Sequence, residues 1–87
     1  MKLKYNFVIN EVAGEYIALA VGSNKGFNGY MRINTTAKDI LELLKDDIDR
    51  DSIVSKLCEM YPDAKISEVG RSVDETLEKL NSAGILI

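Results

Sequence analysis

The sequence contains no histidine and no tryptophan, and it has only one cysteine and one proline among 87 residues. Without histidine, Ser-His and Cys-His nucleophile pairs and histidine-ligated metal sites are excluded. Cys58 has no second cysteine with which to form an internal disulfide, a pattern that suits a reducing compartment. We therefore expect a protein that is not an enzyme, with no catalytic residue, no metal and no cofactor.

Long apolar runs and clusters of basic residues are also missing. The longest apolar run, residues 16–21, is too short to cross a bilayer, and the N-terminus lacks the apolar core of a signal peptide, so we expect a cytoplasmic protein with no membrane partner. The net charge is −3, and the nearest basic pair, Lys2 and Lys4, lies at an end that we expect to fray. Because clustered Lys and Arg supply most of the affinity for phosphate backbones, we expect no nucleic-acid partner.

Two weak motifs point to ligands that the rest of the pattern does not support. Residues 47–51 resemble the opening of a calcium loop, but Ser52 stands where that loop needs Gly and Cys58 where it needs Glu. The three glycines between residues 22 and 29 match no phosphate-binding spacing, and a strand rather than a helix follows them. We interpret both segments as loops.

What is present is an ordinary globular composition, 46% apolar and 29% charged, which predicts one domain over residues 1–87. The first half carries strand patterns, with a tight hairpin at Ala13-Gly14-Glu15 and a turn-rich segment before a third strand of period two. In the third strand we expect Met31 and Ile33 to face the core. The predicted strands cover residues 7–12, 16–21 and 30–34.

After Asn34 the apolar period changes from two to 3.6, which predicts three helices. Thr36 is the expected N-cap of the first helix, and Asp49 or Asp51 that of the second, which ends near Pro62. Gly84 suits the end of the third helix, and the apolar tail after it should pack against the body. The third helix has the clearest stripe, at Ile66, Val69, Val73, Leu77 and Leu80. Three strands followed by three helices predict an α+β fold, with the helices on one side of the sheet.

The third strand has no sequence signal for a further partner, so we expect it to be the open edge of the sheet, available to another chain. Gly70 costs about 1 kcal/mol relative to Ala inside a helix, and a close approach by another chain would explain its presence. The stripe of the third helix could instead be used wholly on its own neighbours. The sequence thus leaves two interpretations open. Either the third strand and the first half of the third helix form a groove for another chain, or the helix packs only against its own neighbours.

These residues together resemble the PqqD family, named for protein D of pyrroloquinoline quinone biosynthesis, whose fold also recognises ribosomally made, modified peptides. The similarity covers nearly the whole chain and lies in four pieces in the right order. They are Phe27-Asn28-Gly29, Ile33-Asn34-Thr35-Thr36-Ala37, the leucine-rich run from Ile40 to Leu44, and Val73 to Leu77 with Leu80 and Gly84-Ile85-Leu86. The resemblance implies recognition of a peptide. It does not imply a role in quinone synthesis itself, because many members of the family serve other peptides.

The resemblance implies a three-stranded sheet packed on a winged-helix-like unit of three helices. It implies a leader segment of a precursor peptide lying between the third strand and the third helix, presented to a modifying enzyme that is commonly of the radical S-adenosylmethionine type. The strand wall would come from Tyr30, Met31, Arg32, Ile33 and Asn34. The helix wall would come from Ile66, Val69, Gly70 and Val73, and Arg71 could pair with acids of the leader.

Two other classes of protein stay open from the sequence. A winged-helix DNA-binding protein shares the three-helix unit and would bind duplex DNA in a salt-dependent way. A structural small subunit of a larger enzyme would carry an exposed apolar patch. For the peptide-binding reading we expect a monomer or a weak dimer.

Overall fold

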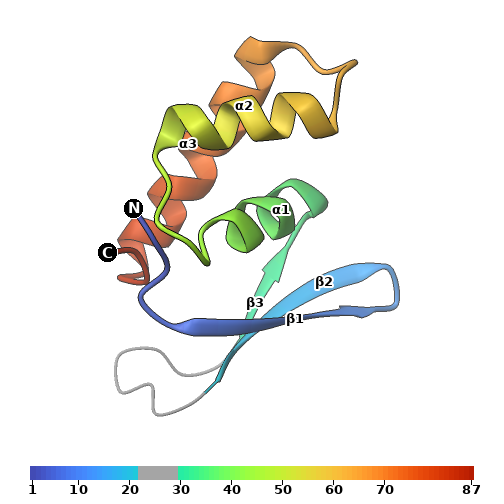
Figure 1. The fold of residues 1–87 in the computed structure, drawn as a ribbon. Coiled ribbons are helices and arrows are strands. Elements are labelled where there is room, and N and C mark those ends of the chain that lie inside the picture. Colours follow the sequence, from blue (N-terminus) through green and yellow to red (C-terminus); the bar gives the residue numbers. More distant parts are fainter. Residues whose placement is uncertain (22–29) are drawn as a thin grey trace.

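The chain folds into a three-stranded antiparallel sheet followed by three helices, in a computed structural model that describes residues 1–21 and 30–87 (Figure 1). This is the predicted α+β class. The predicted turn-rich segment, including the motif with Phe27, lies outside the described residues. The elements are β1 (Asn6–Val12), β2 (Glu15–Val21), β3 (Tyr30–Ile33), α1 (Thr35–Leu43), α2 (Arg50–Met60) and α3 (Ile66–Ser82).

A two-residue turn joins β1 to β2, as the hairpin signal predicts. Ala13 and Gly14 both have positive φ, 52° and 82°, the backbone twist that matches two paired strands. Val12 then pairs with Glu15, and the two strands stay in register along their whole length. The strand order is β1-β2-β3, so β3 pairs with the other side of β2 and forms an edge of the sheet.

The three helices lie on one side of the sheet (Figure 1). Side chains of alternate strand residues point to that side, so Ala18 is fully buried and Met31 and Ile33 pack against the core. The prediction that Met31 and Ile33 face the core is confirmed.

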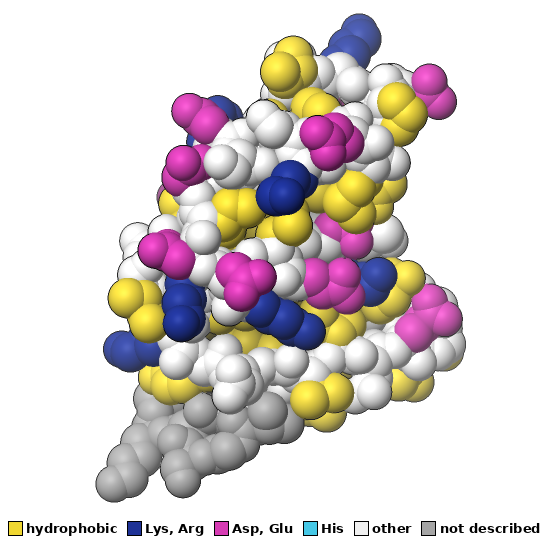
Figure 2. Space-filling model, viewed as in Figure 1, with side chains coloured by type: hydrophobic (Ala, Val, Ile, Leu, Met, Phe, Trp, Pro, Cys, Tyr) yellow, Lys and Arg dark blue, Asp and Glu magenta, His cyan; other side chains and the backbone are white. Residues whose placement is uncertain are grey.

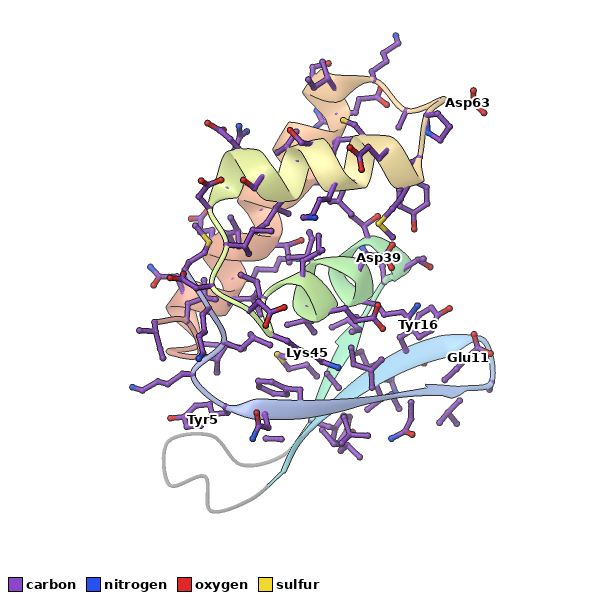
Figure 3. The ribbon with its side chains drawn as sticks, in the orientation of Figure 1. Tyr5, Glu11, Tyr16, Asp39, Lys45 and Asp63 are labelled. Atoms are coloured by element: carbon purple, nitrogen blue, oxygen red, sulfur yellow. The ribbon has the colours of Figure 1, made fainter. Side chains whose placement is uncertain are left out.

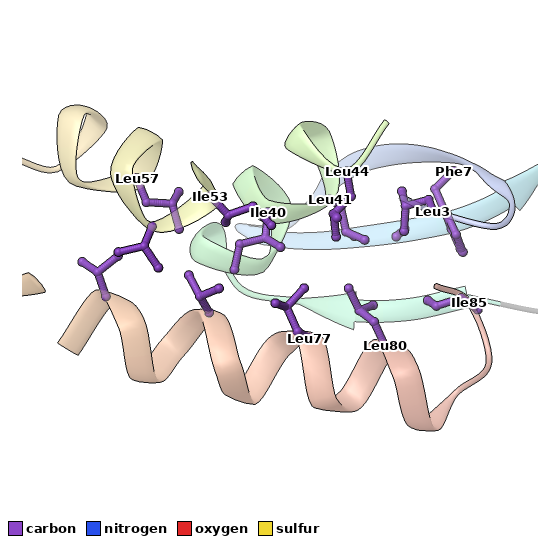
Figure 4. Packing of buried hydrophobic residues seen from close by; sticks show 14 residues of the cluster. Leu3, Phe7, Ile40, Leu41, Leu44, Ile53, Leu57, Leu77, Leu80 and Ile85 are labelled. Carbon is purple, nitrogen blue, oxygen red and sulfur yellow. The ribbon is translucent and has the colours of Figure 1, made fainter. Parts of the chain in front are cut away.

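The core lies between the sheet and the helices, with α1 at its centre (Figure 4). Each helix contributes one apolar stripe, and the last residues of the chain add Ile85, which is fully buried. The stripe of α3 is confirmed except at its first residue, because Ile66 is 71% exposed. The largest fully buried side chains are Ile40, Leu41, Leu44, Ile53, Leu57, Val73 and Ile85.

The start of α1 corrects the predicted N-cap. Asn34 is the cap, and its side-chain oxygen accepts a hydrogen bond of 2.8 Å from the backbone N–H of Ala37. The helix thus begins at Thr35, before the predicted cap at Thr36, because an Asn in extended backbone satisfies the first free N–H groups well. For α2, Asp49 is confirmed as the cap and bonds the N–H of Ser52 at 2.7 Å.

Both ends of the chain are held by backbone hydrogen bonds. Leu3 donates to Leu44, and Lys4 donates to Ile85, so the N-terminal arm lies between the end of α1 and the tail. The expectation that Lys2 and Lys4 lie at a frayed end is wrong, whereas the prediction that the tail packs against the body is confirmed. In the described part of the chain, none of the helices has the length and apolar character that crossing a membrane requires.

Candidate functional site

The outer edge of β3 is free, since no strand among residues 1–21 and 30–87 pairs with it. The C-terminal tail pairs elsewhere, through a bridge between Leu86 and Leu3. On β3, Tyr30 and Arg32 are exposed while Met31 is half-buried, so the edge offers backbone groups and one exposed row of side chains. A free edge of this kind is a template on which another chain can pair.

A pocket of about 230 Å³ lies between the first turn of α1, the end of α2 and the first half of α3. Its floor is apolar, because Leu57 and Val69 are almost fully buried, and its rim carries the polar side chains of Glu68 and Ser72. Thr36, in the first turn of α1, links this pocket to the end of β3. The lining residues are Thr36, Leu57, Tyr61, Ala64, Glu68, Val69 and Ser72.

The side of α3 that carries Glu68, Val69 and Ser72 is here called the open flank. Thr36, which lines the pocket, follows the last residue of β3, Ile33, by three positions in the chain. The free edge of β3 and the open flank together offer hydrogen-bonding groups on one wall and an apolar pocket on the other. Recognition of an extended peptide uses that combination, with backbone pairing for affinity and side-chain pockets for specificity.

The opposite side of α3, which carries Gly70, Arg71 and Asp74, is here called the clamped flank. Arg50 of α2 donates two hydrogen bonds to Asp74, from Nε at 2.9 Å and from Nη2 at 3.0 Å, and a third to Asp51 at 3.1 Å. The guanidinium beside Asp74 lowers the pKa of that carboxyl below its ordinary value. Arg50 therefore ties the start of α2 to α3 on this side.

Gly70 lies next to this clamp and gives the guanidinium of Arg50 room. A Cβ atom at Gly70 would lie 3.0 Å from Nη2 of Arg50, and the same nitrogen lies 3.5 Å from the Gly70 carbonyl oxygen. The space next to Gly70 is thus occupied by an arginine of its own chain. The contact with Arg50 gives a reason for this glycine within the chain itself, and contact of Gly70 with a peptide stays a prediction.

The residues predicted for the site divide between the two flanks. Tyr30, Met31, Arg32 and Ile33 form the free edge, and Val69 lines the open pocket. Asn34 lies at the end of that edge, but its side chain caps α1. Val73 is fully buried, so its side chain belongs to the core. On the clamped flank a wider groove between α2 and α3, of about 630 Å³, is lined by Ile66, Gly70 and Arg71 among others.

A buried acid next to the open pocket has no counterpart in the sequence analysis. Asp39 of α1 is 5% exposed and accepts a hydrogen bond from the hydroxyl of Tyr61. Nζ of Lys38 lies 3.9 Å from Oδ1 of Asp39 and 5.2 Å from the centre of the Tyr16 ring. Figure 3 shows Tyr16 on the sheet side of α1, below Asp39. The bond to Asp39 raises the pKa of Tyr61. This contact holds Tyr61, which lines the pocket, and no local pattern predicts it because the two residues are 22 positions apart.

Charges are mixed on the face that carries α1 and α2. Figure 2 shows Lys and Arg side chains interspersed with Asp and Glu on this face, with apolar side chains between them. A phosphate backbone needs a continuous basic surface, which this face does not present.

The fold and the free edge define a small α+β protein whose third strand is open to pairing on one side. Residues 15–86 match the family described as coenzyme PQQ synthesis protein D (PqqD), and because the match spans most of the chain, the chain belongs to the PqqD family. The family resemblance of the sequence is confirmed. A search of curated proteins finds no match.

Among solved structures, the chain is similar to one titled "TbiB1 in Complex with the TbiA(beta) Leader Peptide". The TM-score is 0.71 at 21% identity, and the alignment covers 99% of this chain and 94% of the other. At this identity the similarity shows the shared fold, which extends over the whole sheet and all three helices.

Proposed function

We propose that residues 1–87 act as one peptide-recognition domain, without catalysis, that binds the leader segment of a ribosomally made precursor peptide. The leader adds a strand to the free edge of β3 and places side chains in the pocket on the open flank of α3. The protein then presents the peptide to a modifying enzyme in the cytoplasm, and the family resemblance favours one of the radical S-adenosylmethionine type.

The observation that carries this proposal is the unpaired edge of β3 next to an open apolar pocket. An edge strand left unpaired invites aggregation unless it is short, covered or used. β3 is only four residues long, so an added strand would form few backbone hydrogen bonds, and pocket contacts must supply the rest. We expect a transient complex that buries less than about 1,200 Å².

The family match and one similar solved structure support the proposal from outside the chain. The chain belongs to the PqqD family, and the similar solved structure, by its title, holds a leader peptide. Transfer of that ligand class to this chain rests on the shared fold together with the free edge and the pocket.

The proposal is tested by titrating ¹⁵N-labelled protein with synthetic N-terminal segments of short open reading frames that lie next to its gene. Amide shifts should cluster at residues 30–33 of β3 and at Glu68, Val69 and Ser72 of α3, and a scrambled peptide of the same composition should cause none. Shifts confined to the clamped flank, around Ser67 and Asp74, would reject the proposed site. Salt-dependent binding of duplex DNA that leaves the β3 amides unmoved would favour the winged-helix alternative.

A further inference from the structure

The face of the sheet turned away from the helices carries two straight rows of side chains that both end at the free edge of β3. In the first row, Val8 lies opposite Leu19 and Leu19 lies opposite Tyr30. In the second row the residues in register are Asn10, Ile17 and Arg32. Neighbours in such a row stand about 5 Å apart at Cβ, so their side chains touch across the strands.

The first row is apolar and open to solvent. Val8 is 46% exposed, Leu19 39% and Tyr30 60%, although each has an inward-facing neighbour in the core. The aromatic ring of Tyr30 stands at the end of this row, where β3 has no neighbour among the described strands. An aromatic or β-branched side chain on an adjacent strand is the partner that such a ring favours.

The second row ends in a guanidinium that is weakly held. The nearest acid to Arg32 is Glu15, at 3.9 Å, and the side chains are 71% and 61% exposed. Ion pairs this exposed contribute little to stability, so Arg32 can turn to a carboxylate on a new neighbouring strand at small cost.

A strand added to β3 extends both rows by one residue each. Successive side chains of a strand point to opposite faces, so guest residues that flank Tyr30 and Arg32 are two positions apart in the guest sequence. This spacing holds for a parallel and for an antiparallel guest, and only the order of the two residues differs. The intervening guest residue points to the helix side, towards α3.

We infer that Tyr30 and Arg32 are specificity-determining residues that read the outward-facing side of the bound peptide. The inference rests on the proposed function. Tyr30 selects an aromatic or β-branched residue, and Arg32 selects Asp or Glu two positions from it. The peptide class is therefore an extended segment with the pattern apolar-x-acid or its reverse, and the order reports the direction of the guest strand.

The probe is a yeast-displayed library of random dodecapeptides, sorted separately against the full-length wild-type protein and three variants. Tyr30→Thr replaces the ring by a β-branched side chain that suits a strand, and Arg32→Glu reverses the charge at the edge. Arg71→Glu is the matched control, because it makes the same charge reversal on the clamped flank. Thermal unfolding of each variant verifies that it is folded.

The wild type should enrich the apolar-x-acid pattern, Arg32→Glu should exchange the acid for Lys or Arg, and Tyr30→Thr should relax the apolar position. Arg71→Glu should keep the wild-type pattern. In one selected peptide, replacing the acid by Lys should weaken wild-type binding about two- to fivefold, the range of a single cross-strand pair, and Arg32→Glu should restore it. A role of Arg32 limited to folding would not produce that rescue.

The result that overturns the inference alone is a selected peptide that shifts the β3 amides while the wild type and Arg32→Glu enrich the same pattern. A change of acid preference in Arg71→Glu rather than in Arg32→Glu also overturns it, because leader acids then pair on the other flank. If no selected peptide shifts the β3 amides, both the inference and the proposed function fail.

Discussion

The two flanks of α3 differ although they belong to one helix and share one buried stripe. On the clamped flank, Arg50 fills the space next to Gly70 and holds Asp74 with two hydrogen bonds. On the open flank, Ser72 and Val69 line a pocket that reaches Thr36 in the first turn of α1. The outer edge of β3, the strand before α1, has no partner strand in the described part of the chain. The chain therefore fixes its last helix from one side with its own charges and leaves the other side accessible.

This difference explains how a small domain can bind a guest without loosening its core. The side chains that hold α3 in place are the buried stripe and the clamp, and of these only Val69 also lines the proposed binding pocket. A guest on the open flank then meets a helix that is already positioned, so little ordering of the protein opposes binding.

The largest effect should come from the stripe that the two flanks share. Leu80 is 4% exposed, so Leu80→Ala should lower the free energy of unfolding by about 2–5 kcal/mol through lost burial and a residual cavity. Ile66 begins the same helix but is 71% exposed, and Ile66→Ala should change that free energy by less than about 0.5 kcal/mol. Urea unfolding measures both, and equal losses would contradict the division of α3 into a buried stripe and an exposed start.

The next largest effect is a difference in peptide affinity between substitutions on the two flanks. Ser72→Gln should fill part of the open pocket and weaken binding of a peptide that shifts β3 about tenfold, equivalent to about 1.4 kcal/mol. Ser67→Gln places the same change on the groove between α2 and α3 and should leave the affinity unchanged. Isothermal titration of both variants tests the assignment, which is wrong if Ser67→Gln weakens binding as much as Ser72→Gln does.

A smaller effect tests whether the clamp explains Gly70. In an Arg50→Ala background, Gly70→Ala should stabilise the protein by about 1 kcal/mol, because alanine favours a helix interior over glycine. In the wild type the gain should be smaller, since the new Cβ would lie 3.0 Å from Nη2 of Arg50. The four denaturation midpoints form a cycle, and equal gains in the two backgrounds would show that Arg50 does not restrict Gly70.

The smallest effect is the pH dependence of the clamp. Arg50 lowers the pKa of Asp74 in the folded state. The pair therefore contributes its full stabilisation at pH values above about 3.9, the pKa of Asp in an unfolded chain. That contribution is lost as the pH falls through the folded value, and Asp74→Asn should show a smaller fall in melting temperature between pH 7 and pH 2.5. Wild type and variant will both keep the acid dependence of Asp47 and Asp49, whose pKa values are also lowered. Identical pH profiles would mean that the clamp contributes nothing.

The sequence predicted the elements because their signals are local. The hairpin at Ala13-Gly14, the cap at Asp49 and the stripe of α3 each depend on residues within a few positions of one another. The cap of α1 was misplaced because Asn34 also continues the alternating pattern of the strand before it. An Asn at such a junction can end a strand and begin a helix at once.

The sequence could not predict the contacts that divide α3 into two flanks. The Arg50–Asp74 pair joins residues 24 positions apart, and the Tyr61–Asp39 bond joins residues 22 apart. Helical spacing places Gly70 near the stripe, but it does not reveal which neighbouring helix supplies the side chain beside it. The free edge was predictable because the sequence shows a third strand and no signal for a fourth strand that could pair with it.

Hydrogen exchange of the β3 amides, with and without a bound leader peptide, tests the central claim most directly. In an antiparallel strand alternate N–H groups face opposite neighbours, so half of the four β3 amides should exchange fast in the free protein and become protected when peptide binds. The amides along the outer edge of β1 serve as an internal control and should stay unprotected. Peptide that binds while every β3 amide exchanges as in the free protein would contradict the addition of a strand at this edge.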